Sequence, residues 1–419
     1  MRYSRCKAGV FIEPDLRPFL LLKRFILFNM EKRAHKWYNY KNYMKFRKCE
    51  NMSEMSEIIK SACAAVRPAD KEIMTKAKER QAQLAKPPGS LGMLEDISIK
   101  VAGMTGKIHN KADKCRIVVL CADNGVCDEG VSCTPQSVTL SQTINLTRGL
   151  TGASSLAKHF GDEVMVVDVG IMSDYNCPAV INRKIAYGTK NLYLEPAMTR
   201  EQAEQAVCVG LEMAKKCAED GVEAIGVGEM GIGNTTTSSA ILSVFTGEPA
   251  SVTAGKGGGL LEDAYRHKIE VIDGAIAKHK PDANDPIDVL AKVGGLDIAA
   301  MAGVFLGAAE HRIPVVIDGF ISVVAALAAA RLCPNVKDYL IASHASFEPG
   351  YQLAIKELGL EAPLLMKMRL GEGSGCPIMF RVMDAAYAIM NEMATFEEAS
   401  INDSYLDEIR IGDNFTVKR

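Results

Sequence analysis

The stretch "EAIGVGEMGIGNTTT" (residues 223–237) joins a short apolar run, a glycine-rich loop and a row of polar side chains. Residues 223–228 are nearly all apolar, as a strand that is buried on both faces of a sheet must be. Asn234 and the threonines after it are typical of the start of a helix, where their side chains cap free backbone groups. A strand, a loop and a helix in this order predict one unit of a parallel α/β sheet.

The same unit recurs along the chain from about residue 69. Longer helical patterns separate the apolar runs, and one of them, 199–220, begins with a possible capping box of Thr199 and Gln202. The alternation predicts an α/β fold in which helices wrap a parallel β-sheet. The other strands are expected at "RIVVLCA" (116–122), "VMVVDV" (164–169), "IPVVID" (313–318) and "YLIAS" (339–343).

Composition excludes several classes of protein. The 419 residues are 48% hydrophobic and 24% charged, and their formal net charge of -2 gives no sign of nucleic-acid binding. Such a chain can bury a large core, in one domain or in two. Four of the 12 cysteines stand six residues apart from Cys115 to Cys133. Zinc ligands come in C-x₂₋₄-C pairs, so we expect reduced thiols in a cytoplasmic protein, and no metal.

The first 51 residues differ from the rest. They hold 13 Lys and Arg against 4 Asp and Glu, and 10 of the 26 aromatic residues. Their apolar run at 18–28 is too short to cross a membrane and lacks a signal cleavage site. This extension is either a membrane-surface arm or, as we favour, a disordered segment or the result of a start codon assigned too far upstream. In the latter case Met52 or Met55 is the expected true start. We expect the catalytic domain at 52–400 and a tail at 401–419.

Polar or glycine-rich loops follow every predicted strand. Because the carboxyl ends of parallel strands meet at one edge, these loops are expected to converge on a ligand site. The helix start at 234–237 can hold a phosphate with backbone N–H groups, hydroxyls and the helix dipole. The loops after the five predicted strands are "ADNG" (122–125), "DVGI" (168–171), "GEMGIGNTTT" (228–237), "DGF" (318–320) and "SHASFEPG" (343–350), and "GEGSG" (371–375), after the apolar stretch "APLLMKM" (362–368), completes the set.

Other side chains near these loops leave alternatives open. Lys268 follows a glycine cluster on a predicted helix, where it is either a solvated charge or the partner of an anion. Ser346 could contact a phosphate, whereas His344 is better explained as a structural histidine. Glu372 stands alone between Gly371 and Gly373, where small neighbours would let a planar heterocycle approach the carboxylate.

A dinucleotide site is the competing interpretation. Gly226, Gly228 and Gly231 spell G-x-G-x-x-G after a strand, and Glu248 lies twenty residues beyond Gly228. The acid of that fingerprint should end a second strand, yet Glu248 lies in a turn sequence. A dehydrogenase that uses NAD is therefore the less favoured hypothesis. A non-catalytic module that senses a nucleotide or a base is the third.

Nine motifs, in order, resemble the nicotinate-nucleotide:dimethylbenzimidazole phosphoribosyltransferase family of cobalamin assembly. The resemblance covers roughly residues 55–400 and leaves the N-terminal extension outside. The motifs are "KPPGSLG" (86–92), "ADNGV" (122–126), "TRGLTGAS" (147–154), "DVGI" (168–171), "GEMGIGNTTTSSA" (228–240), "GGLDIAAMAG" (294–303), "PVVIDGF" (314–320), "SHASFEPG" (343–350) and "RLGEGSG" (369–375).

The resemblance implies a reaction and a set of site residues. Such enzymes transfer the 5-phosphoribosyl group of nicotinate mononucleotide to 5,6-dimethylbenzimidazole, which gives α-ribazole 5'-phosphate and nicotinate. They are cytoplasmic homodimers with a Rossmann-like parallel sheet and a smaller helical subdomain, and they use no metal or redox cofactor. The general base falls on Glu372. Phosphate and ribose contacts are expected at Glu229, Gly231, Gly233, Asn234, Thr235, Lys268 and Ser346, and contacts with the acceptor base at Thr134, Gln142 and Leu370.

Two positions depart from the family's pattern. Asn124 stands where "ADHG" is common, and "GKGGG" (255–259), with Lys256, stands where "GRGTG" is common. An arginine and a lysine are not interchangeable at a bidentate contact. Whether these two residues do the usual work, and which aromatic base is the acceptor, stays open at this point.

Overall fold

The structure is a computed structural model that describes residues 52–406. The chain divides into two units, 1–54 and 55–419. Of the first unit, only the start of α2 (Met52–Ala65) lies in the described range. The predictions for residues 1–51 and for most of the tail therefore fall outside the described residues.

The core of the second unit is a six-stranded sheet in which every pair of neighbours is parallel. The five predicted strands are confirmed, and a short strand of two residues, β3, was not predicted. The order is β3-β2-β1-β4-β5-β6. The strands are β1 (Cys115–Ala122), β2 (Glu163–Gly170), β3 (Ile181–Asn182), β4 (Ala224–Met230), β5 (Val315–Ile317) and β6 (Leu340–Ala342).

The strand order reverses between β1 and β4. The chain builds outward from β1 through β2 to β3, then returns to place β4, β5 and β6 on the other side of β1. Ligands of open parallel sheets bind outside the carboxyl ends of the strands at such a point. The fold therefore directs attention to the loops that leave β1 and β4.

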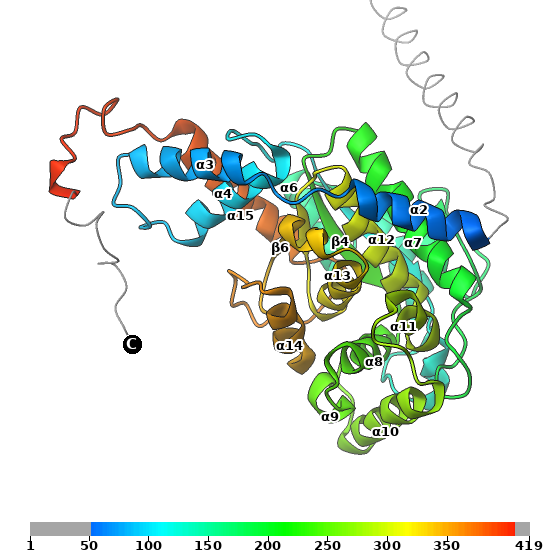
Figure 1. Ribbon diagram of the computed structural model, residues 1–419. Helices are drawn as coiled ribbons and strands as arrows, with labels where there is room; N and C mark the ends of the chain where they lie inside the picture. Colours follow the sequence, from blue (N-terminus) through cyan, green and yellow to red (C-terminus); the bar gives the residue numbers. More distant parts are fainter. Residues whose placement is uncertain (1–51, 407–419) are drawn as a thin grey trace, which may run out of the picture. The chain divides into compact units, whose positions relative to one another are not determined.

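Helices cover the sheet on both faces (Figure 1). On one face α12 packs along β1, β2 and β4, with α7 beside it, and on the other α15 and α6 pack together. The helices that follow β1 in the chain are α5 (Val138–Arg148), α6 (Gly152–Phe160), α7 (Arg200–Glu219), α8 (Asn234–Thr246), α9 (Ala250–Thr253), α10 (Glu262–His279), α11 (Pro286–Val293), α12 (Leu296–Glu310), α13 (Phe320–Leu332), α14 (Pro349–Leu358) and α15 (Cys376–Glu392). Short 3₁₀ helices lie at Gly125–Glu129, Pro334–Tyr339 and Ser404–Leu406.

A smaller helical cluster lies beside the sheet. It consists of α3 (Lys71–Gln83), α4 (Met93–Thr105) and the later part of α15, which lie together in Figure 1. Ala77, Ala102 and Met390 form its own buried apolar cluster. This cluster matches the helical subdomain that the resemblance implies.

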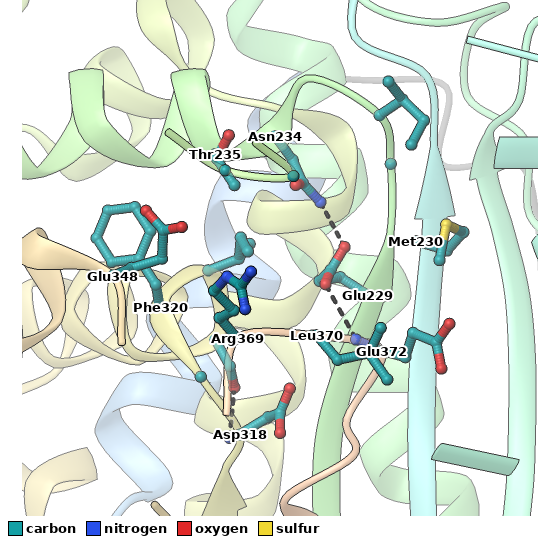
Figure 2. Close-up of a pocket in the computed structure, with 18 of the residues that line it drawn as sticks. Glu229, Met230, Asn234, Thr235, Asp318, Phe320, Glu348, Arg369, Leu370 and Glu372 are labelled. Carbon is teal, nitrogen blue, oxygen red and sulfur yellow. Dashed lines mark hydrogen bonds between the residues drawn. The ribbon is translucent and has the colours of Figure 1, made fainter. Parts of the chain in front are cut away.

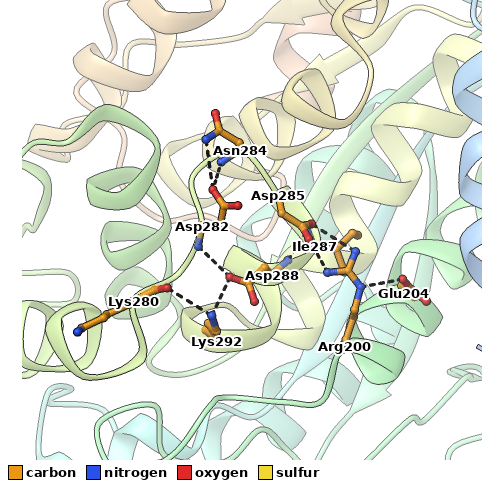
Figure 3. Close-up of polar contacts among 9 residues, drawn as sticks. All are labelled: Arg200, Glu204, Lys280, Asp282, Asn284, Asp285, Ile287, Asp288 and Lys292. Carbon is orange, nitrogen blue, oxygen red and sulfur yellow. Dashed lines mark hydrogen bonds and ion pairs between the residues drawn. The ribbon is translucent and has the colours of Figure 1, made fainter.

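The predicted capping box at the start of α7 is confirmed. Thr199 Oγ1 accepts from the Gln202 N–H at 3.2 Å, and Gln202 Oε1 accepts from the Thr199 N–H at 2.9 Å. The next residue, Arg200, pairs with Asp285 at 2.6 Å, and Asp285 in turn caps α11 (Figure 3). These contacts fix the starts of α7 and α11 against each other.

Within residues 52–406, no helix is long and apolar enough to cross a bilayer. No disulfide joins any two of the ten cysteines of this range. Cys115 and Cys121, at the two ends of β1, are buried and pack in the main core. Their regular spacing therefore follows from their places in and after one strand.

Candidate active site

A pocket opens at the carboxyl edge of the sheet, where the strand order reverses (Figure 2). Its walls come from the loops after β4, β5 and β6, from residues 132–142 and from the turn at 369–372. The predicted residues Glu229, Gly231, Gly233, Asn234, Thr235, Ser346, Thr134, Gln142, Leu370 and Glu372 all line it. Side chains that lie up to 238 residues apart in the sequence are thus brought to one cavity.

Glu372 occupies a turn with unusual backbone geometry. Its φ is +64°, and the flanking Gly371 and Gly373 have φ of +84° and +91°. A side chain in the left-handed region costs free energy and persists only where the surroundings hold it. The Glu372 side chain is only 3% exposed, so its carboxylate does not point into bulk water.

Two acids at the ends of neighbouring strands hold this turn. Glu229 Oε1 accepts the Glu372 backbone N–H at 3.2 Å. Asp318 accepts the N–H groups of Gly373 and Gly375 at 3.1 and 2.6 Å. Burial raises the pKa of both carboxyls, that of Asp318 to about 7. We call Glu229, Asp318 and Glu372 the acid end of the pocket.

The Glu372 carboxylate lies at the start of a helix. Its Oε2 accepts the Ala153 N–H at 3.1 Å, in the first turn of α6. Free N–H groups and the helix dipole favour negative charge at that place. Leu370 packs against Gly152 of the same turn, because a Cβ added to Gly152 would overlap the Leu370 side chain. The N-terminus of α6 therefore faces both residues.

The structure gives a different explanation for the G-x-G-x-x-G pattern. Gly226 and Gly228 belong to β4 itself, and a Cβ added to either would overlap Cys376 or the backbone of Glu372. These glycines let the turn pack against the strand. Glu248 lies in an exposed turn between α8 and α9 and follows no strand. The dinucleotide interpretation thus lacks the context that it requires.

Glu229 and Asn234 were predicted on the phosphate and ribose side, but their side chains are engaged within the protein. Asn234 Nδ2 donates to Glu229 Oε2 at 2.5 Å and to Asp297 Oδ2 at 3.0 Å. Burial and the Glu229 charge raise the pKa of Asp297 to about 7. This network supports the acid end, and a buried carboxylate is a poor partner for a phosphate. That Glu229 contacts the phosphate or ribose of the substrate stays a prediction.

The opposite part of the pocket is the lysine end, which we define as Thr235 and Gly257, which line the cavity, together with Lys268, which lies behind them and does not line it. The Lys268 side chain is fully buried, and its Nζ donates to Thr235 Oγ1 at 2.9 Å. Burial lowers the pKa of Lys268 to about 8. The alternative of a solvated charge is therefore wrong. A buried ammonium beside the first turn of α8 is suited to an anion.

The remaining predicted residues lie around the same cavity. Thr134 and Gln142 line it, as does Leu370, whose side chain is 59% exposed. His344 also lines the pocket, but burial lowers its pKa to about 4, and Ser343 Oγ lies 3.0 Å from its Nδ1. A neutral, hydrogen-bonded imidazole agrees with the structural role expected for it.

Of the two departures from the family's pattern, Asn124 and Lys256 lie outside the lining of the pocket, whereas Gly257 and Gly258 of the GKGGG segment line it. Asn124 is fully buried, and its Nδ2 donates to the Ile232 carbonyl oxygen at 3.4 Å, so it supports the loop after β4 from behind. Lys256 pairs with Glu262 at 2.9 Å at an exposed position. Neither side chain is among those that contact the cavity.

Sequence reasoning missed three charged side chains of the pocket: Asp318, Glu348 and Arg369. Each stands in a motif that was noticed, "DGF", "SHASFEPG" and "RLGEGSG". Their position directly after a strand or beside the Glu372 turn was the available signal. The roles of Asp318 and Arg369 depend on contacts that no local pattern reveals.

Comparison with known proteins places this geometry in a family. A family described as "Phosphoribosyltransferase" matches residues 66–401. Nicotinate-nucleotide–dimethylbenzimidazole phosphoribosyltransferase of Clostridium perfringens (strain ATCC 13124) is 53% identical over 356 residues, which cover 85% of this chain and 98% of that protein. The protein of the same name from Ruminiclostridium cellulolyticum is 50% identical over 81% of this chain and 97% of its own length.

A solved structure agrees with the sequence relatives. The crystal structure of CobT from Thermus thermophilus superimposes with a TM-score of 0.77 at 36% sequence identity, and covers 80% of this chain and all of that chain. With the family match and the curated relatives, this agreement confirms the predicted fold. The chain belongs to the nicotinate-nucleotide–dimethylbenzimidazole phosphoribosyltransferase family.

Proposed function

We propose that this protein transfers the 5-phosphoribosyl group of nicotinate mononucleotide to 5,6-dimethylbenzimidazole or a related base. The products are α-ribazole 5'-phosphate, for the lower-ligand nucleotide loop of cobalamin, and free nicotinate. Relatives that this chain matches over nearly their whole length bear the name of this reaction. The observation that carries the proposal is a buried carboxylate, Glu372, in one pocket with an anion site at Thr235 and Lys268.

The chemistry explains why one carboxylate suffices. The ring nitrogen of the bound nicotinate is already cationic, so the bond from the anomeric carbon breaks without a general acid. One nitrogen of the acceptor forms the new bond, and its other nitrogen must lose a proton. Glu372 accepts that proton, and an aromatic acceptor that excludes water strengthens it as a base. Displacement from the opposite face converts a β-linked nucleotide into an α-linked product.

Each oxygen of the Glu372 carboxylate has its own task in this proposal. Oε2 is held by the Ala153 N–H. Oε1 accepts no hydrogen bond from any residue in the described range, and we assign the proton to it. Leu370 shares the neighbour Gly152 with this acid, and Thr134 and Gln142 line the same cavity; these three residues would hold the acceptor ring.

The lysine end would position the other substrate. Lys268, Thr235 and the glycine loop at 257–258 would hold the phosphate, with Ser346 and the backbone of Gly231 and Gly233 near the ribose. Holding the anomeric carbon about 3–3.5 Å from the attacking nitrogen supplies much of the rate. The proposal requires no metal and no redox cofactor.

Three features of the proposal extend beyond the site. The catalytic domain spans residues 52–400, the protein acts in the cytoplasm, and two copies form a homodimer, as the resemblance implies. Light scattering on the purified full chain should give twice the mass of one chain. The mass of a single chain at micromolar concentration would contradict the dimer.

Incubation with nicotinate mononucleotide and 5,6-dimethylbenzimidazole tests the reaction. Chromatography should show equal amounts of nicotinate and α-ribazole 5'-phosphate, each dependent on both substrates. A change of absorbance at 340 nm with a nicotinamide cofactor would instead support a dehydrogenase. Binding of both substrates without turnover would support a sensing module.

A further inference from the structure

The pocket is rich in acids and poor in cations. Four carboxyl side chains line it, those of Glu229, Asp318, Glu348 and Glu372, whereas Arg369 is the one Lys or Arg among the lining residues in the described range. Lys268 lies just behind this wall, where it is bonded to Thr235. Nicotinate mononucleotide carries two anionic groups, a phosphate and a ring carboxylate. Each of these anions needs a cation in such an acidic cavity.

Arg369 is not neutralised by the protein. Its side chain is exposed to the cavity, and within residues 52–406 it makes no hydrogen bond or ion pair. Glu229 and Asp318 already accept backbone N–H groups of the turn. Glu348 is 8% exposed and its Oε2 has no partner. Burial raises the pKa of Glu348, and the charges of Lys268 and then of Arg369 oppose that rise, although neither side chain forms an ion pair with Glu348.

The direction of the Arg369 side chain separates it from the base. In Figure 2, Arg369 and Glu372 leave the same segment in different directions, Arg369 toward Glu348 and Glu372 away from it. In the proposed reaction the acceptor base and the leaving nicotinate lie on opposite faces of the anomeric carbon. A side chain that points away from Glu372 is suited to the leaving group.

We propose that the Arg369 guanidinium binds the carboxylate of the nicotinate ring and thereby selects nicotinate over nicotinamide nucleotides. This inference rests on the proposed function. Lys268 and Thr235 already form a site for the phosphate, so the free guanidinium is left for the second anion. A planar guanidinium and a carboxylate form two parallel hydrogen bonds, and an amide cannot replace the charge of the carboxylate.

The test compares Arg369→Met with a matched control, Lys367→Met. Lys367 is an exposed cation two residues earlier in the same segment and does not line the pocket. For Arg369→Met, kcat/KM with nicotinate mononucleotide should fall about 10- to 100-fold, while kcat/KM with nicotinamide mononucleotide changes less than about threefold. Lys367→Met should leave both within about threefold of wild type.

The arms of the experiment separate the two anions. Equal losses with both nucleotides would mean that Arg369 serves the phosphate and would overturn the proposal, as would no loss at all. The same loss in Lys367→Met would reduce the effect to a general field and overturn it too. Free nicotinate, which has no phosphate, should bind Arg369→Met about tenfold more weakly by calorimetry, and ribose 5-phosphate should bind it as it binds wild type.

The calorimetric arm does not depend on turnover. If wild type released no nicotinate from the mononucleotide, the proposed function would fail, and the affinity for free nicotinate would still report on Arg369. Unchanged nicotinate affinity in Arg369→Met would overturn the assignment whatever the outcome for the reaction.

Discussion

The two ends of the pocket are built in different ways. At the lysine end, a regular helix start and one buried ammonium meet through a single hydrogen bond of 2.9 Å. At the acid end, Glu372 lies in a left-handed turn that two buried carboxyls and a helix N-terminus hold in place. The difference indicates that a phosphate can be held by ordinary secondary structure, whereas a base must be fixed precisely by several tertiary contacts.

Apart from a substitution of Glu372 itself, Asp318→Asn should have the largest effect among the variants that test this comparison of the two ends. An amide offers only one acceptor oxygen, so one of the N–H groups of Gly373 and Gly375 would face an NH₂ group. We expect kcat/KM to fall roughly 10²–10³-fold, because small displacements of a reacting group are costly. Circular dichroism should show a folded protein.

Asp297→Asn is the matched control for that variant. Asp297 is also a buried acid whose pKa is raised to about 7, as that of Asp318 is, but its Oδ2 accepts from Asn234 and its Oδ1 has no partner, so it holds no N–H group of the Glu372 turn. We expect a change of less than about fivefold. Equal losses in the two variants would mean that burial of acid, rather than support of the turn, sets the effect.

At the lysine end, Lys268→Met should act on binding rather than on chemistry. Loss of one charge-assisted hydrogen bond should raise the Kd of nicotinate mononucleotide about 10- to 100-fold, with a smaller change in kcat. Lys256→Met, which removes an exposed cation paired with Glu262, should change the Kd less than about threefold. A larger effect on kcat than on Kd would contradict the claim that the lysine end serves binding and the acid end serves the chemical step.

The pH dependence of binding should also distinguish the ends. Burial depresses the pKa of Lys268 to about 8, and a bound phosphate favours the charged ammonium. The Kd of the nucleotide should be nearly steady below pH 7, about double by pH 8, and then rise toward tenfold per pH unit as Lys268 loses its proton. Isothermal titration calorimetry of wild type and Lys268→Met measures this. A rise of the same slope in the variant would assign the titration to another group.

The smallest effect should come from a change remote from both ends. A chain that starts at Met52 should keep kcat/KM within about twofold of the full chain, since the proposed catalytic domain begins there. The family match, which starts at residue 66, supports this expectation. A tenfold loss would show that the N-terminal extension contributes to the site.

Much of the fold could be predicted because its signals are local. The five predicted strands lie in apolar runs of five residues or more, although β5 and β6 themselves have three residues each, and the Thr199–Gln202 box marks the start of α7. The missed strand, β3, has two residues, too few for any periodic pattern. Residues 362–368 are apolar yet form no strand beyond one isolated bridge at Leu364.

The site residues also divide into those with a local sequence signal and those without one. The helix start at Asn234 and the isolated Glu372 are visible in short stretches, so they could be nominated from the sequence. The tasks of Asp318 and Glu229 depend on N–H groups 55 and 143 residues away. No local pattern carries that information, and the resemblance alone placed Glu229 among the phosphate and ribose contacts.

Single-turnover kinetics of Glu372→Gln test the central claim most directly. The variant keeps the shape of the side chain and the contact with the Ala153 N–H, but cannot take up a proton. The account predicts that the rate of nicotinate release with 5,6-dimethylbenzimidazole falls roughly 10²–10⁴-fold while the Kd of nicotinate mononucleotide stays within about threefold of wild type. Release at nearly the wild-type rate would show that another group accepts the proton.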